Sequence, residues 1–392
     1  MDNKRKNELI NIYREGLLED ILPFWFPNVI DEKFGGYMII RDRDGSILDT
    51  DKGMWTQCRF AWLLATVYNT VEKRDEWLKG ALHGIDFIAK HGFDDDGRMW
   101  FHVTREGKPI RKRRYVFTEF FAAKAFAACA RASGDEKLVQ RANETYQLAK
   151  TYLLNPDLGP KKFTDTRPTR GLAVPLIRLG VAQEMRLNLE DDSYTTEVDE
   201  AINEIRDYFV KPELKCVMET VGDNGEILDH FDGRTVNPGH AIEGAWFILL
   251  EARLRGDDPD LVQLGCNMLD WMWKRGWDEE CGGIYYFRDL EGKPVQEYWH
   301  DMKQWWVQNE TVLGTLLAYL ITKESRYAEM HRQIHDWVYA HFPDKKYGEW
   351  YGYLHRDGRV SVPLKGNMWK GPYHLPRMLL NGWKWLEADL ES

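Results

Sequence analysis

Two histidines stand where helices are expected to begin, and an imidazole in such a place could exchange protons with a bound ligand. His240 follows Asn237-Pro-Gly, in which the asparagine is a good N-cap and the proline fits the first helical position. His374 lies between Pro372 and Pro376, which also fit only near a helix start. The unpaired amides at a helix start favour anionic oxygen and help to keep an imidazole neutral. Both histidines are therefore candidate acid–base groups.

Charged residues near the two histidines complete a chemically useful set. Glu243 comes three residues after His240, on the same face of the predicted helix. A second set is formed by Trp306-Val-Gln-Asn-Glu310 and by Arg377, which follows His374. Two opposed imidazoles with arginines and carboxylates suit the removal of a proton beside a carbonyl group. One imidazole takes the proton, the other returns it to the opposite face, and a guanidinium holds the enolate oxygen.

These residues would be positioned by a helical unit that recurs about every sixty residues. Each unit has an amphipathic helix, a glycine-rich hairpin and a second helix that is apolar nearly all round. The first helices are predicted at 7–26, 75–90, 136–154, 196–209, 259–273 and 326–341. The second helices carry the landmarks Arg59, Thr118, Leu172, His240, Gln308 and His374. This pattern predicts two concentric rings of six helices, an all-α (α/α)6 barrel with short β-hairpins at its mouth.

In such a barrel the loops and the starts of the inner helices meet at one mouth. An open solenoid is the alternative, but it would leave the second helices less uniformly apolar. Because no linker or low-complexity stretch interrupts the repeats, we predict a single domain, 1–392. The catalytic candidates at the mouth are His240 and His374. The substrate-binding candidates are Arg59, Glu243, Glu310, Arg377, Trp306, Tyr115 and Glu119.

Several of these residues also have a purely structural interpretation. Trp306 could pack in the core instead of stacking on a sugar ring. Tyr115 and Glu119 could simply begin a helix, and Arg59 could be an ordinary buried ion-pair partner. The hairpin of the third repeat is the hardest to recognise, since 164–171 takes its place.

The composition limits the partners. The 392 residues are 43% hydrophobic and 13% aromatic, which is ample for a core, and the net charge of −10 argues against nucleic acid. The five cysteines are scattered and form no C-x-x-C, so they suggest neither a disulfide framework nor a zinc site. We expect no metal or redox cofactor. His331 and His335 have zinc-compatible spacing but are expected on the surface of an outer helix. With no apolar leader and no bilayer-length apolar run, the chain is expected to be soluble, cytoplasmic and free of membrane contacts.

The chain resembles the N-acylglucosamine 2-epimerase family, which includes the animal renin-binding proteins. The segments that carry the resemblance are Gly35-Gly-Tyr, Trp55-Thr-Gln-Cys-Arg59, Asn237-Pro-Gly-His240, Trp306-Val-Gln-Asn-Glu310 and Tyr373-His-Leu-Pro-Arg377. They occur in order over most of the chain, and the likeness is weakest in the third repeat. The resemblance implies an (α/α)6 barrel. It also implies interconversion of N-acetylglucosamine and N-acetylmannosamine, sugars of sialic acid metabolism, by proton removal and return at C2 of the ring-opened sugar.

The resemblance also implies roles for single residues. His240 and His374 would be the acid–base pair, and Arg59 would bind near the reacting oxygens. Glu243 and Glu310 would orient the histidines or the sugar hydroxyls.

Further implications of the resemblance concern the sixth repeat, assembly and regulation. Arg377 would fix the sixth-repeat loop. A homodimer is implied. ATP or another nucleotide is allowed as an activator, although the chain has no G-x-x-x-x-G-K-[ST] loop.

Other functions stay open on the sequence. Cellobiose 2-epimerases and mannose isomerases belong to the same superfamily, but the cellobiose enzymes are expected to carry a histidine on the third inner helix. No histidine occurs here between His102 and His230, which favours the acylamino-sugar branch. A glycoside hydrolase using Glu243 and Glu310 is a third enzymatic alternative. A non-catalytic interaction module is compatible with the fold, but it would not need a titratable cavity.

Overall fold

The protein folds into two concentric rings of helices. The computed structural model describes residues 1–155, 158–159 and 162–391. The inner ring consists of α3 (Met54–Thr70), α5 (Phe117–Ser133), α7 (Ala173–Leu189), α10 (Pro238–Leu254), α12 (Trp305–Thr322) and α14 (His374–Glu391). The outer ring consists of α1 (Asn3–Glu15), α4 (Asp75–His91), α6 (Glu136–Leu154), α8 (Tyr194–Glu204), α11 (Pro259–Gly276) and α13 (Ser325–His341). The predicted (α/α)6 barrel is therefore confirmed.

The burial of the two rings follows their sequences. In α12 every residue from Trp305 to Leu320 is buried, as expected for a helix with neighbours on all sides. In α6 only Ala142, Thr145, Tyr146 and Ala149 are buried, which is one helical stripe facing inward. No helix of the described chain is both long and apolar enough to cross a membrane.

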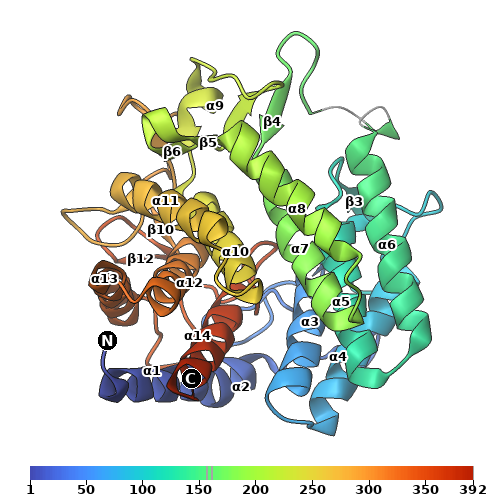
Figure 1. Ribbon diagram of the computed structural model, residues 1–392. Coiled ribbons are helices and arrows are strands. Elements are labelled where there is room, and N and C mark those ends of the chain that lie inside the picture. Colours follow the sequence, from blue (N-terminus) through green and yellow to red (C-terminus); the bar gives the residue numbers. More distant parts are fainter. Residues whose placement is uncertain (156–157, 160–161, 392) are drawn as a thin grey trace.

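The ring is closed by the two ends of the chain. Each of the first five inner helices packs against the outer helix that follows it, whereas α14 packs against α1 (Figure 1). The helix predicted at 7–26 runs from Asn3 through a π-helical segment (Gly16–Ile21) to α2 (Leu22–Trp25). Similarly, α8 continues into a π-helical segment at Ile205–Phe209. Both predicted helices are thus present, but neither is a regular α-helix along its whole length.

Short strands form the hairpins at the mouth. Two three-stranded sheets have the orders β1-β2-β3 and β10-β11-β12, and the other pairs are β4-β7, β5-β6 and β8-β9. The first sheet comprises Lys52–Gly53, Trp100–Val103 and Pro109–Lys112, and the second Lys303–Gln304, Tyr353–Leu354 and Val360–Val362. The pairs comprise Thr169–Gly171 with Thr220–Gly222, Val210–Lys211 with Cys216–Val217, and Thr235–Val236 with Arg288–Asp289. Two further short helices are Pro212–Leu214 and α9 (Phe231–Arg234).

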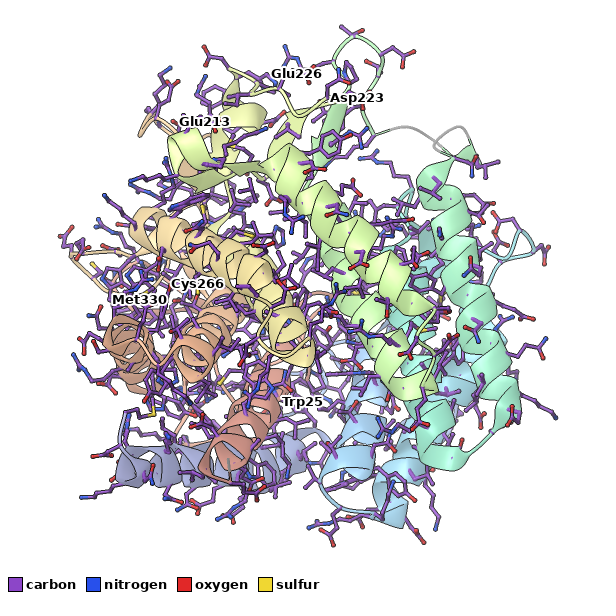
Figure 2. The ribbon with its side chains drawn as sticks, viewed as in Figure 1. Trp25, Glu213, Asp223, Glu226, Cys266 and Met330 are labelled. Atoms are coloured by element: carbon purple, nitrogen blue, oxygen red, sulfur yellow. The ribbon has the colours of Figure 1, made fainter. Side chains whose placement is uncertain are left out.

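The described residues of the third repeat form no hairpin of their own, in agreement with its weak sequence signal. Its strand β4 pairs instead with β7 of the fourth repeat. The loop after β7 carries Asp223 and Glu226 at the periphery of the molecule (Figure 2).

One side chain near the start of an inner helix holds each of three hairpins. Gln57 bonds both backbone groups of Tyr37 at 2.7 Å, and Gln308 bonds both backbone groups of Ile284 at 2.8 Å. Glu119 bonds one backbone group of its hairpin, accepting from the Met99 amide at 2.9 Å. Because a buried backbone group without a partner is costly, these side chains fix the position of the mouth relative to the barrel.

Buried Asp–Lys–Arg groups reinforce the mouth in three repeats. In one of them, Asp278 accepts from Lys303 at 3.0 Å and from Arg356 at 2.8 Å, with aspartate and lysine almost fully buried. The other two are Asp31 with Lys52 and Arg105, and Asp344 with Lys365 and Arg43. A buried charge is tolerated only when paired, so each group makes its hairpin and inner helix depend on each other.

The surface location expected for His331 and His335 is wrong. Both are buried, at 1% and 4% exposure, because α1 covers this face of α13. The Nε2 atom of His331 lies 3.1 Å from the Tyr13 hydroxyl, and the Nδ1 atom of His335 lies 3.4 Å from Arg5. The closure of the ring by the N-terminal helix was not visible in the charge pattern of α13 itself.

Candidate active site

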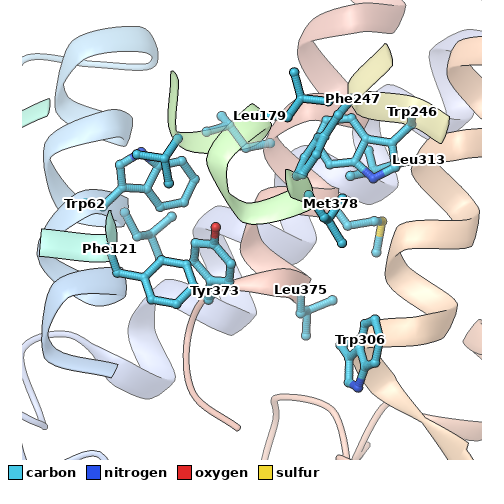
Figure 3. Packing of buried hydrophobic residues seen from close by; sticks show 14 of the residues in the cluster. Trp62, Phe121, Leu179, Trp246, Phe247, Trp306, Leu313, Tyr373, Leu375 and Met378 are labelled. Carbon is cyan, nitrogen blue, oxygen red and sulfur yellow. The ribbon is translucent and has the colours of Figure 1, made fainter. Parts of the chain in front are cut away.

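A cavity of about 1340 Å³ runs through the middle of the barrel. At the mouth it is lined by Arg59, His240, Trp306 and His374, so these four of the residues predicted to converge do meet there. It continues along the inner helices towards their other ends, where Trp385 lines it. Figure 3 shows Trp306 at the mouth side of this region, with Tyr373 and Phe121 opposite.

His240 is held at the start of α10 by its backbone and by a carboxylate. Asn237 caps the helix, its Oδ1 accepting from the His240 amide at 3.1 Å. The Nδ1 atom lies 2.9 Å from Oε1 of Glu219, a residue between β6 and β7. The imidazole is 27% exposed towards the cavity. Burial alone would lower the pKa of His240, but the charge and hydrogen bond of Glu219, aided by the charge of Glu243, raise it above the ordinary value.

His374 has the same kind of partner but the opposite pKa shift. Its Nδ1 atom lies 2.7 Å from Oε1 of Glu310, and its side chain is 11% exposed. Burial lowers the pKa of His374 well below its usual range, and the positive charges of Arg377 and Arg59 add to this. A neutral imidazole that donates from Nδ1 keeps a free lone pair on Nε2. The arrangement therefore favours His374 as a base.

A buried ionic cluster surrounds Glu310. Its Oε1 accepts from Arg377 at 2.7 Å as well as from His374, and its Oε2 accepts from the Trp246 indole at 2.8 Å. Arg377 also donates to Glu243. Because the guanidinium compensates both carboxylates, the charge of Glu310 is shared and does not act on His374 alone.

Both catalytic candidates lie against one indole. The ring centroid of Trp306 is 5.0 Å from that of His240 and 5.8 Å from that of His374. For both histidines Nδ1 is occupied by a carboxylate, and Nε2 has no hydrogen-bond partner within the described ranges. The two free nitrogens are thus available to one ligand in the cavity.

Arg59 is held by aromatic rings rather than by anions. Its guanidinium carbon lies 4.2 Å from the centroid of Phe121 and 4.4 Å from that of Tyr373, and Trp55 is 5.5 Å away. Its Nε atom is buried without a hydrogen-bond partner among the described residues. Burial lowers the pKa of Arg59, although a guanidinium keeps its proton at neutral pH. Since its donors are not used by the protein, Arg59 can bind an oxyanion in the cavity.

Comparisons with known proteins agree with this geometry. The family described as N-acylglucosamine 2-epimerase (GlcNAc 2-epimerase) matches residues 35–376. The chain belongs to this family. The N-acylglucosamine 2-epimerase of Bos taurus is 31% identical over 370 residues, which are 92% of this chain and 87% of that protein. The human N-acylglucosamine 2-epimerase is 27% identical and covers 96% of this chain, with 91% of its own length matched.

Solved structures show the same fold. A cellobiose 2-epimerase from Bacillus thermoamylovorans superposes with a TM-score of 0.84 at 22% identity, over 96% of this chain and 99% of that chain. A D-mannose isomerase superposes with a TM-score of 0.82 at 20% identity, over 95% and 97%. Family membership makes this chain a carbohydrate isomerase, as the sequence resemblance predicted.

Three predicted substrate-binding residues of this epimerase-family chain, Tyr115, Glu119 and Glu310, are not among those lining the cavity, and the first two also lie outside the Glu310 cluster. Glu119 is fully buried and accepts from Arg98 at 2.6 Å and from the Met99 amide at 2.9 Å. It is the repeat equivalent of Gln57, so its position serves the hairpin. Tyr115 packs on Phe117 at the rim, with ring centroids 4.7 Å apart. The other seven candidates are at the cavity or in the Glu310 cluster that borders it.

Sequence analysis missed three polar residues of this site. Glu219 is 21 residues before His240 and lies on a hairpin with no distinctive pattern. Lys124 lies within the apolar helix α5, and Tyr373 precedes His374 within a motif that was otherwise recognised. Glu219 could have been found only by asking which hairpin carboxylate faces the fourth inner helix, and Lys124 by asking why an apolar helix contains one lysine.

The Glu310 cluster also has the form of a cation site. Ligand atoms of Glu243, Glu310 and His374 all lie within 4.8 Å of one another. The guanidinium of Arg377, however, donates to both carboxylates. The positive charge that these oxygens need is therefore supplied by a side chain of the protein.

Proposed function

We propose that this protein interconverts N-acetylglucosamine and N-acetylmannosamine by proton transfer at C2 of the ring-opened sugar. The observation that carries the proposal is the pair His240 and His374. Both line one cavity against Trp306, and each has Nδ1 on a carboxylate and an Nε2 with no partner in the part of the chain that the structure describes. A two-base epimerisation needs such a pair, because the proton leaves one face of C2 and returns on the other.

The opposite pKa shifts support different protonation states for the two histidines. His374, with its pKa lowered, is the neutral base of the resting enzyme, and His240, with its pKa raised, is the protonated acid. Two titratable groups whose environments push their pKa values apart are suited to acid and base roles at one pH. After one turnover the proton has moved from one histidine to the other, which is the form required for the reverse reaction.

Arg59 supports the proposal as the oxyanion group. Removing the C2 proton of an aldose places negative charge on O1, and the guanidinium of Arg59 lies at the cavity with no ion pair or hydrogen bond to the residues that the structure describes. Glu219 and Glu310 hold the imidazoles, and Arg377 with Glu243 keeps Glu310 in place. Trp306 provides an apolar face beside the reacting carbon.

Two related reactions use the same barrel. Cellobiose 2-epimerisation and aldose–ketose isomerisation are suggested by the names of the superposed structures. The third inner helix offers Ala173, Leu176 and Ile177 to the cavity and has no histidine, which favours the acylamino-sugar reaction. A ketose product would identify the isomerase reaction instead.

The decisive experiment follows deuterium at C2 by proton NMR in D2O. Wild type is given N-acetylmannosamine or N-acetylglucosamine, with and without ATP, and we expect the other epimer to appear with deuterium at C2. The ATP arm measures the activation that the family resemblance allows. Mannose and cellobiose serve as comparison substrates.

Variants of the two histidines test the two-base mechanism itself. His240→Ala and His374→Ala should both fail to epimerise, yet each retains one base. Each variant should therefore exchange C2 hydrogen of one epimer only, and the two variants should differ in which epimer exchanges. His230→Asn, on a loop beside α9, is the matched histidine control and should keep normal activity. Epimerisation by either alanine variant would contradict the mechanism.

A further inference from the structure

A second polar group lies beyond the histidines, where Lys124 meets Tyr373. Lys124 is 3% exposed and lines the cavity from α5. Its Nζ donates to the Tyr373 hydroxyl at 3.1 Å and lies 3.9 Å from the centre of the Trp62 ring. The nearest carboxylate, of Glu184, is 3.9 Å away and accepts from Trp62 and Asn188. An ammonium has three hydrogens, so Lys124 has donors left over.

The Tyr373 hydroxyl is in the same situation. A phenol oxygen has two acceptor sites and one hydrogen. Lys124 and Arg377 both donate to it, the latter from NH1 at 3.3 Å, and neither side chain can accept. No acceptor for the phenolic hydrogen occurs in the part of the chain that the structure describes. Tyr373 lines the cavity, and Figure 3 shows it beside Phe121 and Trp62.

Lys124 and Tyr373 thus form a pocket that offers hydrogens to the cavity, and they have no acceptor site left between them; another acceptor, Oε1 of Glu184, lies 3.9 Å from the Lys124 Nζ. A sugar hydroxyl placed between these two donors would need an acceptor for its own hydrogen, which neither Lys124 nor Tyr373 supplies. A carbonyl oxygen has two lone pairs and no hydrogen, so it fits well. A buried donor without a partner is costly, which makes the pocket selective for ligands that supply this oxygen.

The pocket is joined to the catalytic centre by one side chain. Arg377 donates from NH1 to Tyr373, while its NH2 lies 3.4 Å from Nδ1 of His374. Tyr373 also stacks on Arg59 and meets His374 edge to face, with ring centroids 4.9 Å apart. An acyl carbonyl oxygen is three bonds from C2 of an acylamino sugar, which suits a pocket adjacent to the reacting carbon.

We infer that Tyr373 and Lys124 form the acyl-recognition pocket, in which both donate to the carbonyl oxygen of the substrate's N-acyl group. The ring of Phe121, which lines the cavity with its centroid 6.1 Å from that of Tyr373, faces the remainder of the acyl group, and Trp62 packs against Tyr373 at 5.3 Å. The inference rests on the proposed function only for the identity of the substrate. Selection of acylamino sugars over plain sugars would then come from α5 and the residue before His374.

The test measures binding of two unreactive open-chain ligands by titration calorimetry. N-acetylglucosaminitol carries the acyl group, and glucitol has a hydroxyl in its place. Neither has a carbonyl at C1, so neither can be epimerised. Wild type should bind the acetamido compound at least tenfold more tightly. Tyr373→Phe and Lys124→Met should each weaken that binding about tenfold and leave glucitol binding within about threefold.

Tyr353→Phe is the matched control. Tyr353 also lines the cavity, but its hydroxyl already bonds to the side chain of Asn367, at 3.0 and 3.4 Å. Its removal should leave the preference for the acetamido ligand unchanged. Thermal melting checks that each variant is folded, and Lys124→Met carries the test if Tyr373→Phe is not.

The outcomes separate this inference from the proposed function. Equal loss of both ligands in the Tyr373 and Lys124 variants, no loss of either, or no preference in wild type would each overturn the acyl pocket. Absence of C2 exchange in wild type would overturn the proposed function, while a selective loss of acetamido binding would still support the pocket.

Discussion

The carboxylate of Glu219 offers the sharpest test of how His240 is tuned. In Glu219→Gln the side chain keeps its shape but loses its charge. The wild-type contact is a hydrogen bond of 2.9 Å between partly buried groups, with 20% of the Glu219 side chain exposed. Hydrogen bonds to charged groups contribute about 1.5–3 kcal/mol, and the exposure places this one near the lower end. If that energy acts on the protonated acid in the transition state, kcat should fall about 10- to 30-fold.

The same substitution should also shift the pH dependence of kcat in a defined direction. Glu219 raises the pKa of His240, and the proposed acid is active only while protonated. Activity of wild type should therefore fall as pH rises through that pKa. Without the carboxylate the pKa of His240 falls, so the alkaline limb of kcat should move to lower pH in Glu219→Gln.

The assay is C2 deuterium incorporation into N-acetylmannosamine, followed from pH 5 to 10. Glu226→Gln is the control, because Glu226 lies on the same segment but at the periphery, bonded to Asn224 (Figure 2). It should match wild type in both rate and pH profile. If Glu219→Gln also keeps the wild-type kcat and alkaline limb, His240 is not the acid described above.

Three other predictions follow from buried groups. Glu310→Gln should lower kcat at least about 100-fold in the same NMR assay, since the lost charge holds His374 within a fully buried cluster; a loss under tenfold would contradict this. Asp278→Asn leaves Lys303 buried without its carboxylate, so urea unfolding at pH 7 should show about 3–5 kcal/mol less stability. Burial raises the pKa of Asp278, but Arg356 and Lys303 outweigh burial and lower it. The stability difference between wild type and Asp278→Asn should therefore shrink as pH falls below about 4. A difference that stays constant with pH would refute this explanation. Burial lowers the pKa of His331, so between pH 7 and 5 this histidine takes up a proton in the unfolded chain but not in the folded protein. Wild-type stability should therefore decline over this range, and it should decline less in the double variant Tyr13→Phe/His331→Leu. Equal declines would contradict this prediction.

The architecture was predictable because it follows from patterns that are local in sequence. The alternation of amphipathic and wholly apolar helices, such as α6 and α12, reports how many sides of each helix are covered. Asn237 and Pro238 likewise mark the start of α10 by local backbone chemistry, and the structure has both at these positions. The ends of a helix and the number of its buried sides can be predicted because both depend on residues that are close together in sequence.

The sequence predicted less well which residues occupy equivalent positions in the different inner helices. The landmarks were aligned by spacing, which paired Arg59 with Gln308. The hairpin bonds show instead that Gln57, Glu119 and Gln308 are equivalent, two residues away from that alignment in the first repeat. A shift of two residues turns a helix by more than half a turn, and the shift of one residue between Thr118 and Glu119 in the second repeat turns it by about 100°. Glu119 faces a hairpin and not the cavity. Spacing alone does not give the rotation of an inner helix.

Contacts between residues that are far apart in sequence could not be predicted. Lys124 and Tyr373 are 249 residues apart, and the buried contact of Tyr13 with His331 spans 318. Each depends on the closure of the ring, which brings the first and last repeats together. A lone lysine in α5 or a histidine pair in α13 has no neighbour in sequence that would reveal its partner.

The difference between the two histidines shows why a motif cannot assign acid and base. Both have a glutamate on Nδ1 at nearly the same distance, 2.9 and 2.7 Å. Yet Glu310 is shared with Arg377, whose charge also acts on His374, whereas Glu219 faces His240 without such a cation in contact. Burial lowers the pKa of both histidines; the charge of Arg377 adds to this effect at His374, whereas Glu219 outweighs it at His240. It follows that exchanging Arg377 for a neutral residue should make the two histidines more alike and weaken the division of roles between them.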